Sequence, residues 1–144
     1  MQDLPHQYIV VARAMPHGEV KINADAVEPI ISAPPVEFGG PGNRWSPESL
    51  LVASVADCFI LTFRAISRAS KLEWVSLQCE ANGTLNKADG ATRFTRFDIQ
   101  ATLEISGETS ETKAHRIMEK AEQNCLITNS LSAPTHLKAE IIIK

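Results

Sequence analysis

The feature that most constrains the fold is a long apolar helix predicted near the middle of the chain. Its start is well marked: Ser46 can cap the first backbone N–H groups, Pro47 suits the first helical position, and Glu48 is favourable at the positive end of the helix dipole. The helix can continue to about Ser70, which makes it roughly 37 Å long if straight. Because apolar residues occupy nearly every face of its first two-thirds, from Leu50 to Phe63, we expect that part to be buried on all sides.

Short segments bounded by turn residues predict strands on both sides of this helix. We expect strands at Gln7–Ala14, Glu19–Asn23, Val27–Ser32, Trp74–Asn86, Arg93–Ser106 and His136–Lys144, a second helix at about Ser110–Asn124, and a turn or helix start at Leu126–Leu131. The Pro- and Gly-rich stretch Ala33–Asn43 predicts an irregular loop, and Asn86–Gly90 is typical of a hairpin connection. The order β-β-β-α-β-β-α-β predicts an α+β fold with a mainly antiparallel sheet packed on the long central helix. No linker or repeat divides the chain, so we expect a single domain over residues 1–144.

Composition excludes several classes of function. With a net charge of -3 and scattered basic residues, the chain lacks the basic stripe that a nucleic acid or an anionic membrane would require. The apolar run is interrupted by Ser54, Asp57 and Thr62 and is too short to span a bilayer. The first residues do not resemble a signal peptide, and three cysteines are few for a disulfide framework. We therefore expect a cytoplasmic protein with reduced thiols.

Two of the cysteines are candidates for chemistry. Cys58 lies inside the apolar helix and Cys125 follows the second helix, so they can meet only through the fold, where they would form a redox-active dithiol. Ser54 and Thr62 lie one turn either side of Cys58, which gives a polar stripe that could face a crevice or another subunit. Cys58 could equally be an ordinary core residue, because free cysteine is often buried. Cys125, at a junction between elements, should be the easier of the two to expose, whereas Cys79 falls on the apolar face of a strand and is expected in the core.

A cysteine reacts as its thiolate, and an apolar environment raises the thiol pKa unless a cation or a hydrogen-bond donor offsets it. The candidate cations are Arg13, His17 and Arg44, and Glu48 could hold an arginine through a bidentate pair. Glu48 precedes Cys58 by ten helical residues, or about 15 Å along the axis. A Glu-Arg-Cys cluster therefore requires a bent helix, a loop that reaches across, or a second subunit.

Two segments resemble motifs of the osmotically inducible protein C / organic hydroperoxide resistance (OsmC/Ohr) family. One is Gly42–Ala53 (GNRWSPESLLVA) followed by Ala56–Phe59 (ADCF), and the other is Cys125–Leu131 (CLITNSL). The resemblance implies an intertwined homodimer that acts as a thiol-dependent peroxidase in oxidative or osmotic stress defence, with no metal, haem or other cofactor. By position, Cys58 would be the peroxidatic cysteine and Cys125 the resolving cysteine. Glu48 would orient an activating arginine.

The resemblance further implies that Cys58 attacks an organic hydroperoxide, or hydrogen peroxide, to give a sulfenic acid and then a Cys58–Cys125 disulfide. An external dithiol, such as a lipoylated protein, would reduce that disulfide. Family members commonly supply the activating arginine from the loop between the early strands, but here that loop reads Met15–Glu19 (MPHGE). Arg44 is the substitute that we assign. Asp57 is a second departure, because a negative charge beside the cysteine would raise its pKa.

Two other readings remain from the sequence. These departures suit a non-catalytic relative that binds a small lipophilic molecule in an apolar crevice at the dimer interface. A metal site built from the cysteines with His115 or His136, or a Cys/His hydrolase, has less support, since neither the close ligand pairs of zinc sites nor a protease signature is present.

Overall fold

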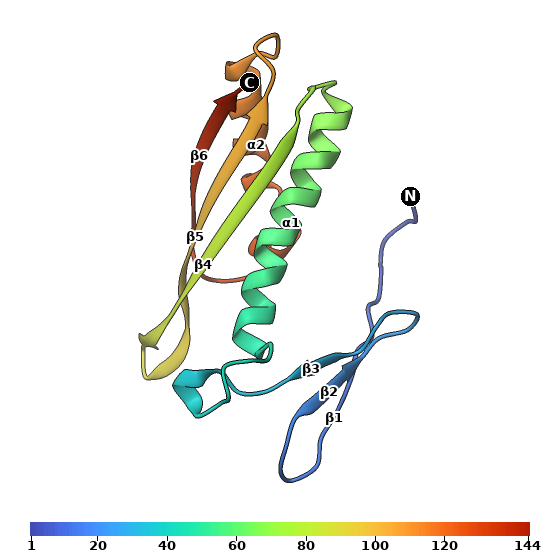
Figure 1. Ribbon diagram of the computed structural model, residues 1–144, viewed down its shortest axis with the longest axis vertical. Helices are drawn as coiled ribbons and strands as arrows, with labels where there is room; N and C mark the ends of the chain where they lie inside the picture. Colours follow the sequence, from blue (N-terminus) through green and yellow to red (C-terminus); the bar gives the residue numbers. More distant parts are fainter. The chain divides into compact units, whose positions relative to one another are not determined.

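The computed structural model describes residues 1–144 and divides them into two compact units, Met1–Leu51 and Val52–Lys144, each described here by itself. The first unit contains β1 (Val11–Arg13), β2 (Val20–Asn23), β3 (Ile30–Ser32), the 3-10 helix η1 (Val36–Phe38) and the start of α1 (Pro47–Ala69). The second contains the rest of α1, β4 (Ser76–Ala88), β5 (Ala91–Ile105), α2 (Glu111–Gln123), α3 (Leu126–Asn129) and β6 (Thr135–Ile143). Figure 1 shows these elements along the chain. The α+β class and the predicted order are confirmed, while the single-domain expectation stays a prediction.

The first unit is built on an antiparallel sheet in the order β1-β2-β3. The first strand is shorter than predicted, because Val11 already pairs with Asn23, the last residue of β2, and earlier residues have no partner there. The loop that was expected to be wholly irregular contains the 3-10 turn η1. This turn is closed at Gly39, which adopts a φ of 86° and whose N–H donates to the Val36 carbonyl.

The start of α1 is fixed by a reciprocal cap. The Ser46 hydroxyl accepts a hydrogen bond from the Ser49 N–H at 3.1 Å, and the Ser49 hydroxyl accepts one from the Ser46 N–H at 2.9 Å. These bonds satisfy two backbone donors that the first turn of a helix leaves unpaired. The predicted cap and the predicted end of the helix near Ser70 are confirmed.

The second unit contains a three-stranded sheet in the order β4-β5-β6, with β4 antiparallel and β6 parallel to β5. The hairpin between β4 and β5 is tighter than the predicted five-residue connection. Asn86 to Ala88 continue the ladder opposite Ala91 to Arg93, and only Asp89 and Gly90 form the turn. Both turn residues have positive φ, of 53° and 80°, as a two-residue turn matching the strand twist requires.

Alternate residues of β5 form the centre of the core, as the strand periodicity predicted. These residues are completely or almost completely buried, and they are Phe97, Ile99, Ala101, Leu103 and Ile105. Gly83 on β4 allows α1 to approach this sheet closely, because a Cβ there would lie 2.8 Å from Cγ2 of Val52 and 2.9 Å from Cε1 of Phe94. Figure 1 shows α1 running alongside the sheet.

The prediction that the apolar part of α1 is buried on all sides was wrong. Within α1 only the Val55, Phe59, Phe63 and Ser67 stripe is buried, and Leu61 is 50 % exposed. The stripe recurs every four residues because a single sheet covers one face of a helix. By length and composition alone α1 could also cross a membrane, with a mean hydropathy of 1.8, but a core helix meets the same two criteria.

Candidate functional site

Cys58 lies in the middle of α1, on the edge of the face that packs on the sheet. Its side chain is half-buried, whereas Phe59 beside it is fully buried. One turn further on, the hydroxyl oxygen Oγ1 of Thr62 lies 3.8 Å from Sγ of Cys58. The helix thus holds a thiol and a hydroxyl in contact at the border between core and surface.

Cys125 is held by the short connection between α2 and α3. The start of α2 is capped by the Ser110 hydroxyl, and its apolar stripe, with Met118 at the centre, is buried on the sheet. The helix stops at Asn124, so Cys125 becomes the residue that precedes α3. Cys125 is completely buried, which reverses the expectation that it would be the more exposed thiol, because α2 turns its last residues into the core.

The fold brings Cys58 and Cys125 together. Burial would raise the pKa of the Cys58 thiol, but the backbone N–H of Ile127, the Cys125 thiol, the Thr62 hydroxyl and the backbone N–H of Leu126 outweigh it by hydrogen bonding to the sulfur. The pKa of Cys58 is therefore lowered from its ordinary value, although Asp57 is adjacent in the sequence. Hydrogen bonds that favour the thiolate in this way make a cysteine a better nucleophile at neutral pH.

The other two thiols are shifted in the opposite direction. Burial raises the pKa of Cys125, and the neighbouring Cys58 raises it further because the protonated Cys125 thiol can donate to the Cys58 sulfur and because two thiolates repel each other. Burial and the charge of Cys125 together raise the pKa of Cys79 to about 11, and Cys79 is half-buried on β4. Of the three thiols, Cys58 alone has a pKa shifted in the direction that favours ionisation. Cys79 was expected in the core but is only half-buried, because β4 is less covered than β5.

A cavity of about 970 Å³ opens beside Cys58 between α1, the end of α2 and α3. Its apolar wall is formed by Leu61, Ala65, Ile66, Leu126 and Ile127. Asp57 and Lys120 add one charge of each sign. Leu126 is 75 % exposed and Leu61 is 50 % exposed, so the cavity presents apolar side chains to its surroundings. A concave, mostly apolar lining with a few polar groups is typical of sites for small molecules.

The predicted partners of the reactive thiol lie in the first unit, and Arg44 is not paired as expected. Its guanidinium donates to the carboxylate of Glu19, so the anticipated Arg44–Glu48 pair is absent. Glu19 is exposed and can be reached without desolvation, whereas Oε1 of Glu48 is buried and has no hydrogen-bond partner. The catalytic roles of Glu48 and Arg44 stay predictions.

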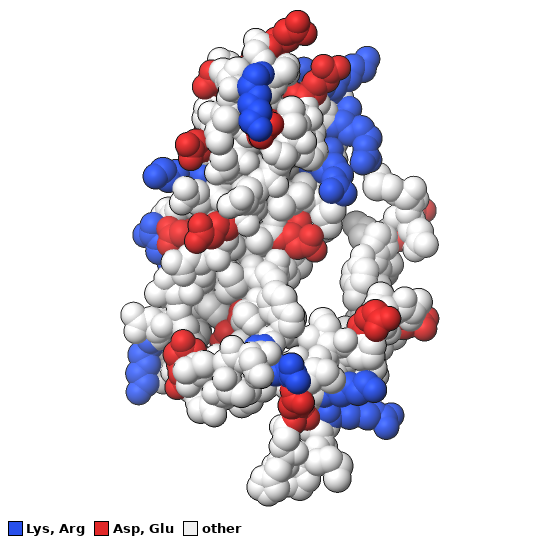
Figure 2. Space-filling model, in the orientation of Figure 1, with Lys and Arg blue, Asp and Glu red and all other residues white.

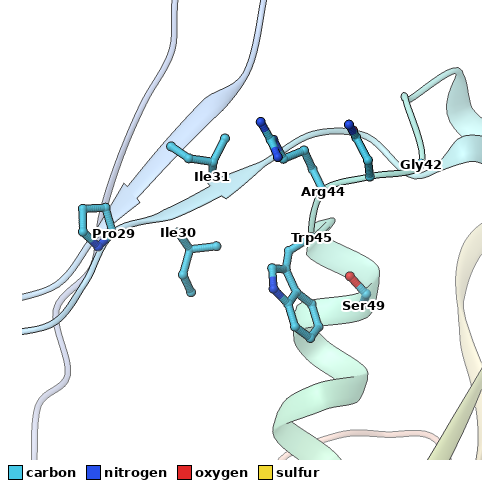
Figure 3. A pocket seen from close by; sticks show the side chains of 8 residues that line it. Pro29, Ile30, Ile31, Gly42, Arg44, Trp45 and Ser49 are labelled. Atoms are coloured by element: carbon cyan, nitrogen blue, oxygen red, sulfur yellow. The ribbon is translucent and has the colours of Figure 1, made fainter.

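A second cavity, of about 620 Å³, lies beside Arg44 in the first unit. Figure 3 shows the Trp45 indole and Ser49 at the start of α1, with Ile30 and Ile31 on β3. Its lining contains no thiol, and the Ser49 hydroxyl is already bonded to Ser46. The Cys58 cavity is therefore the better candidate for covalent chemistry.

Sequence reasoning missed the donors that surround the Cys58 sulfur. Leu126 and Ile127 contribute backbone N–H groups, which leave no trace in residue identity. The available signal was positional: Cys125 precedes a short helix, where the first N–H groups lack intrahelical partners. Lys120 was also missed, since its place on the cavity wall depends on how α2 packs.

Charges of both signs are interspersed on the molecular face shown in Figure 2. No continuous basic stripe runs across that face, in keeping with the net charge of -3. The structure also contains no group of three or more His, Cys, Asp or Glu side chains that could hold a metal ion.

Comparisons with known proteins point to one family. A family model described as OsmC-like protein matches residues 40–140. A curated relative, the uncharacterized protein YmaD of Bacillus subtilis, is 28 % identical over 113 residues, covering 76 % of this chain and 75 % of that protein.

Solved structures share the fold. An OsmC-like protein of unknown function from Vibrio cholerae has a TM-score of 0.84 at 19 % identity, covering 96 % of this chain and 100 % of the other. The organic hydroperoxide resistance protein OsmC of Legionella pneumophila has a TM-score of 0.74 at 21 % identity, covering 96 % and 98 %. The organic hydroperoxide resistance protein OhrB of Bacillus subtilis has a TM-score of 0.68 at 19 % identity, covering 95 % and 98 %.

Proposed function

Because this chain belongs to the OsmC-like protein family, we propose that it is a thiol-dependent peroxidase acting in oxidative-stress defence. The observation that carries the proposal is the pair of neighbouring thiols Cys58 and Cys125, of which Cys58 lines an apolar cavity and whose pKa values are shifted in opposite directions. Two titratable groups with opposed shifts are typical of a site that divides two chemical roles.

In the first step the Cys58 thiolate attacks the distal oxygen of a hydroperoxide. The sulfur–oxygen bond forms as the oxygen–oxygen bond breaks, so sulfur is oxidised to a sulfenic acid and the substrate leaves as an alcohol after taking a proton from solvent. The lowered pKa of Cys58 supports this role, because it increases the fraction of thiolate at neutral pH.

In the second step Cys125 condenses with the sulfenic acid, releasing water and forming a Cys58–Cys125 disulfide. Its raised pKa keeps Cys125 protonated until Cys58 has reacted, and the two thiols lie close enough for each to shift the pKa of the other. An external dithiol, such as a lipoylated protein, then restores both thiols by exchange.

The substrate that we propose is an organic hydroperoxide, with hydrogen peroxide as a poorer alternative. Five apolar side chains form the wall beside Cys58, so a hydrocarbon group gains burial there that hydrogen peroxide cannot. Neighbours in structure that are named organic hydroperoxide resistance proteins, such as OhrB, suggest the same substrate class.

We also propose that the chain works as a homodimer. Leu61 and Leu126 beside the cavity are exposed in the single chain, as are Tyr8, Ile9 and Trp45 in the first unit. Exposed apolar surface of this extent favours contact with a second copy. Sedimentation of the purified protein at micromolar concentration should give twice the mass of one chain.

A second candidate function is favoured by the pairing of Arg44 with Glu19. If that pair persists, Arg44 is not available to Glu48, and the apolar cavity could serve a non-catalytic relative that binds a small lipophilic molecule. This reading predicts that the thiols persist in the presence of peroxide.

Peroxide consumption tests the proposed function. Cumene hydroperoxide is incubated with the protein and a small dithiol, and its loss is compared for the wild type, Cys58→Ser and Cys79→Ser. We expect turnover by the wild type and Cys79→Ser and none by Cys58→Ser, because Cys79 has a pKa of about 11 and takes no part. Equal activity of Cys58→Ser and wild type would contradict the proposal.

A further inference from the structure

The hydroxyl of Thr62 makes an unusual contact for a threonine within a helix. Such a hydroxyl commonly bonds to the carbonyl four residues earlier, which here would be that of Cys58. Instead its hydrogen bond is to the Cys58 sulfur, with Oγ1 and Sγ separated by 3.8 Å. The same side chain lines the apolar cavity together with Cys58, so it lies beside the space from which a hydroperoxide would reach the sulfur.

We propose that Thr62 is a further catalytic residue, whose hydroxyl bridges the Cys58 sulfur and the distal oxygen of the bound hydroperoxide. This inference rests on the peroxidase function proposed above and assigns a role to the polar stripe that the sequence placed around Cys58. It concerns how the substrate is oriented and is separate from the stabilisation of the thiolate.

The other donors around the sulfur cannot provide this bridge. The backbone N–H groups of Leu126 and Ile127 donate to the sulfur but have no lone pair with which to accept a hydrogen bond. The Cys125 thiol is a weak acceptor, and it is the group that must later form the disulfide. A hydroxyl has one hydrogen and two lone pairs, so Thr62 can donate to Sγ and accept from the O–H of the hydroperoxide at once.

In this arrangement the distal oxygen of the hydroperoxide is held next to the attacking sulfur. As the sulfur–oxygen bond forms, the electron pair of the oxygen–oxygen bond leaves with the proximal oxygen, which takes its proton from water in the open cavity. The distal oxygen keeps its own hydrogen and becomes the oxygen of the sulfenic acid. Thr62 neither gains nor loses a proton overall, and its contribution is orientation of the reacting atoms.

The test compares two electrophiles at a pH where Cys58 is fully ionised. Rapid-mixing measurements give the second-order rate constants of Cys58 with cumene hydroperoxide and with iodoacetamide, from pH 6 to the plateau of each profile. Mass spectrometry of the Cys58 peptide assigns each product. The variants are Thr62→Val, which is nearly isosteric and lacks the hydroxyl, Thr62→Ser, which retains it, and Thr62→Ala, which checks for an effect of the added methyl group.

On the plateau we expect Thr62→Val and Thr62→Ala to react with cumene hydroperoxide about tenfold more slowly than the wild type, in line with the loss of one hydrogen bond in the transition state. Thr62→Ser should recover most of the rate. Iodoacetamide has no O–H to orient, so its plateau rate should not fall in any variant; it should stay the same or rise slightly, because a thiolate that loses a hydrogen bond becomes more nucleophilic.

Equal plateau rates with peroxide for Thr62→Val and wild type would overturn the inference. So would a parallel loss with both electrophiles, because that result would place Thr62 in thiolate stabilisation or packing alone. A wild-type protein that forms no sulfenic acid or disulfide with peroxide would instead overturn the proposed function itself, and the inference with it.

Discussion

Oxidation of the proposed dithiol should stabilise the folded chain, and the effect can be estimated from the position of the two cysteines. Cys58 lies in α1 and Cys125 in the connection to α3. A bond between them would close a loop of 67 residues, which is their separation in the sequence. For a loop of this length, loss of entropy in the unfolded chain contributes about 4 kcal/mol at 25 °C. With an unfolding entropy proportional to 144 residues, this corresponds to a rise in Tm of about 13 °C. Strain in a disulfide that must later be reduced lowers the gain, so we expect between about 5 and 13 °C.

Differential scanning calorimetry before and after one equivalent of cumene hydroperoxide measures this rise. Cys125→Ser is the matched control, because it can form the sulfenic acid at Cys58 but cannot close the loop. A wild-type protein that loses two thiols without a rise in Tm would refute the reasoning from loop entropy. A rise that depends on Cys79 would show that the wrong pair of cysteines was assigned.

Three further predictions follow from the site and its support. The Cys125→Ala variant lacks the thiol that lowers the pKa of Cys58, so the pH profile for alkylation of Cys58 by iodoacetamide should move to higher pH. A profile that stays in place would show that Cys125 does not stabilise the Cys58 thiolate. Cys79→Ser should leave the rate of peroxide reaction unchanged in stopped-flow measurements, since a thiol with a pKa of about 11 is un-ionised at neutral pH. Gly83→Ala should destabilise the fold by about 1–3 kcal/mol in urea titrations, because its new Cβ would press on Val52; undiminished stability would mean that α1 can shift away from the sheet at little cost.

Local signals in the sequence were sufficient for most elements of the fold. The Ser46–Pro47 start of α1 and the alternation along β5 determined structure because caps and strand periodicity act over a few residues. The hairpin turn was placed correctly at Gly90 but made too long, since only pairing across the ladder decides where a strand ends. Burial of α1 on all sides was wrong because it depends on how much surface the sheet can cover.

The site was harder to predict than the fold. The resemblance of two motifs to a family suggested that Cys58 and Cys125 meet, and the packing of α2 and α3 accounts for it physically. The same packing buries Cys125 and brings two backbone N–H groups to the Cys58 sulfur, neither of which is visible in residue types. Arg44 was assigned to Glu48 on sequence proximity, whereas the structure pairs it with Glu19, 25 residues away.

Counting free thiols before and after one equivalent of cumene hydroperoxide tests the central claim most directly. The reduced chain has three cysteines, and the account predicts that one free thiol remains, with Cys58 and Cys125 joined in a single peptide-mapped disulfide. Cys125→Ser should instead accumulate a sulfenic acid at Cys58 that dimedone traps. Three free thiols after treatment, in a protein that is folded and fully reduced at the start, would contradict the account.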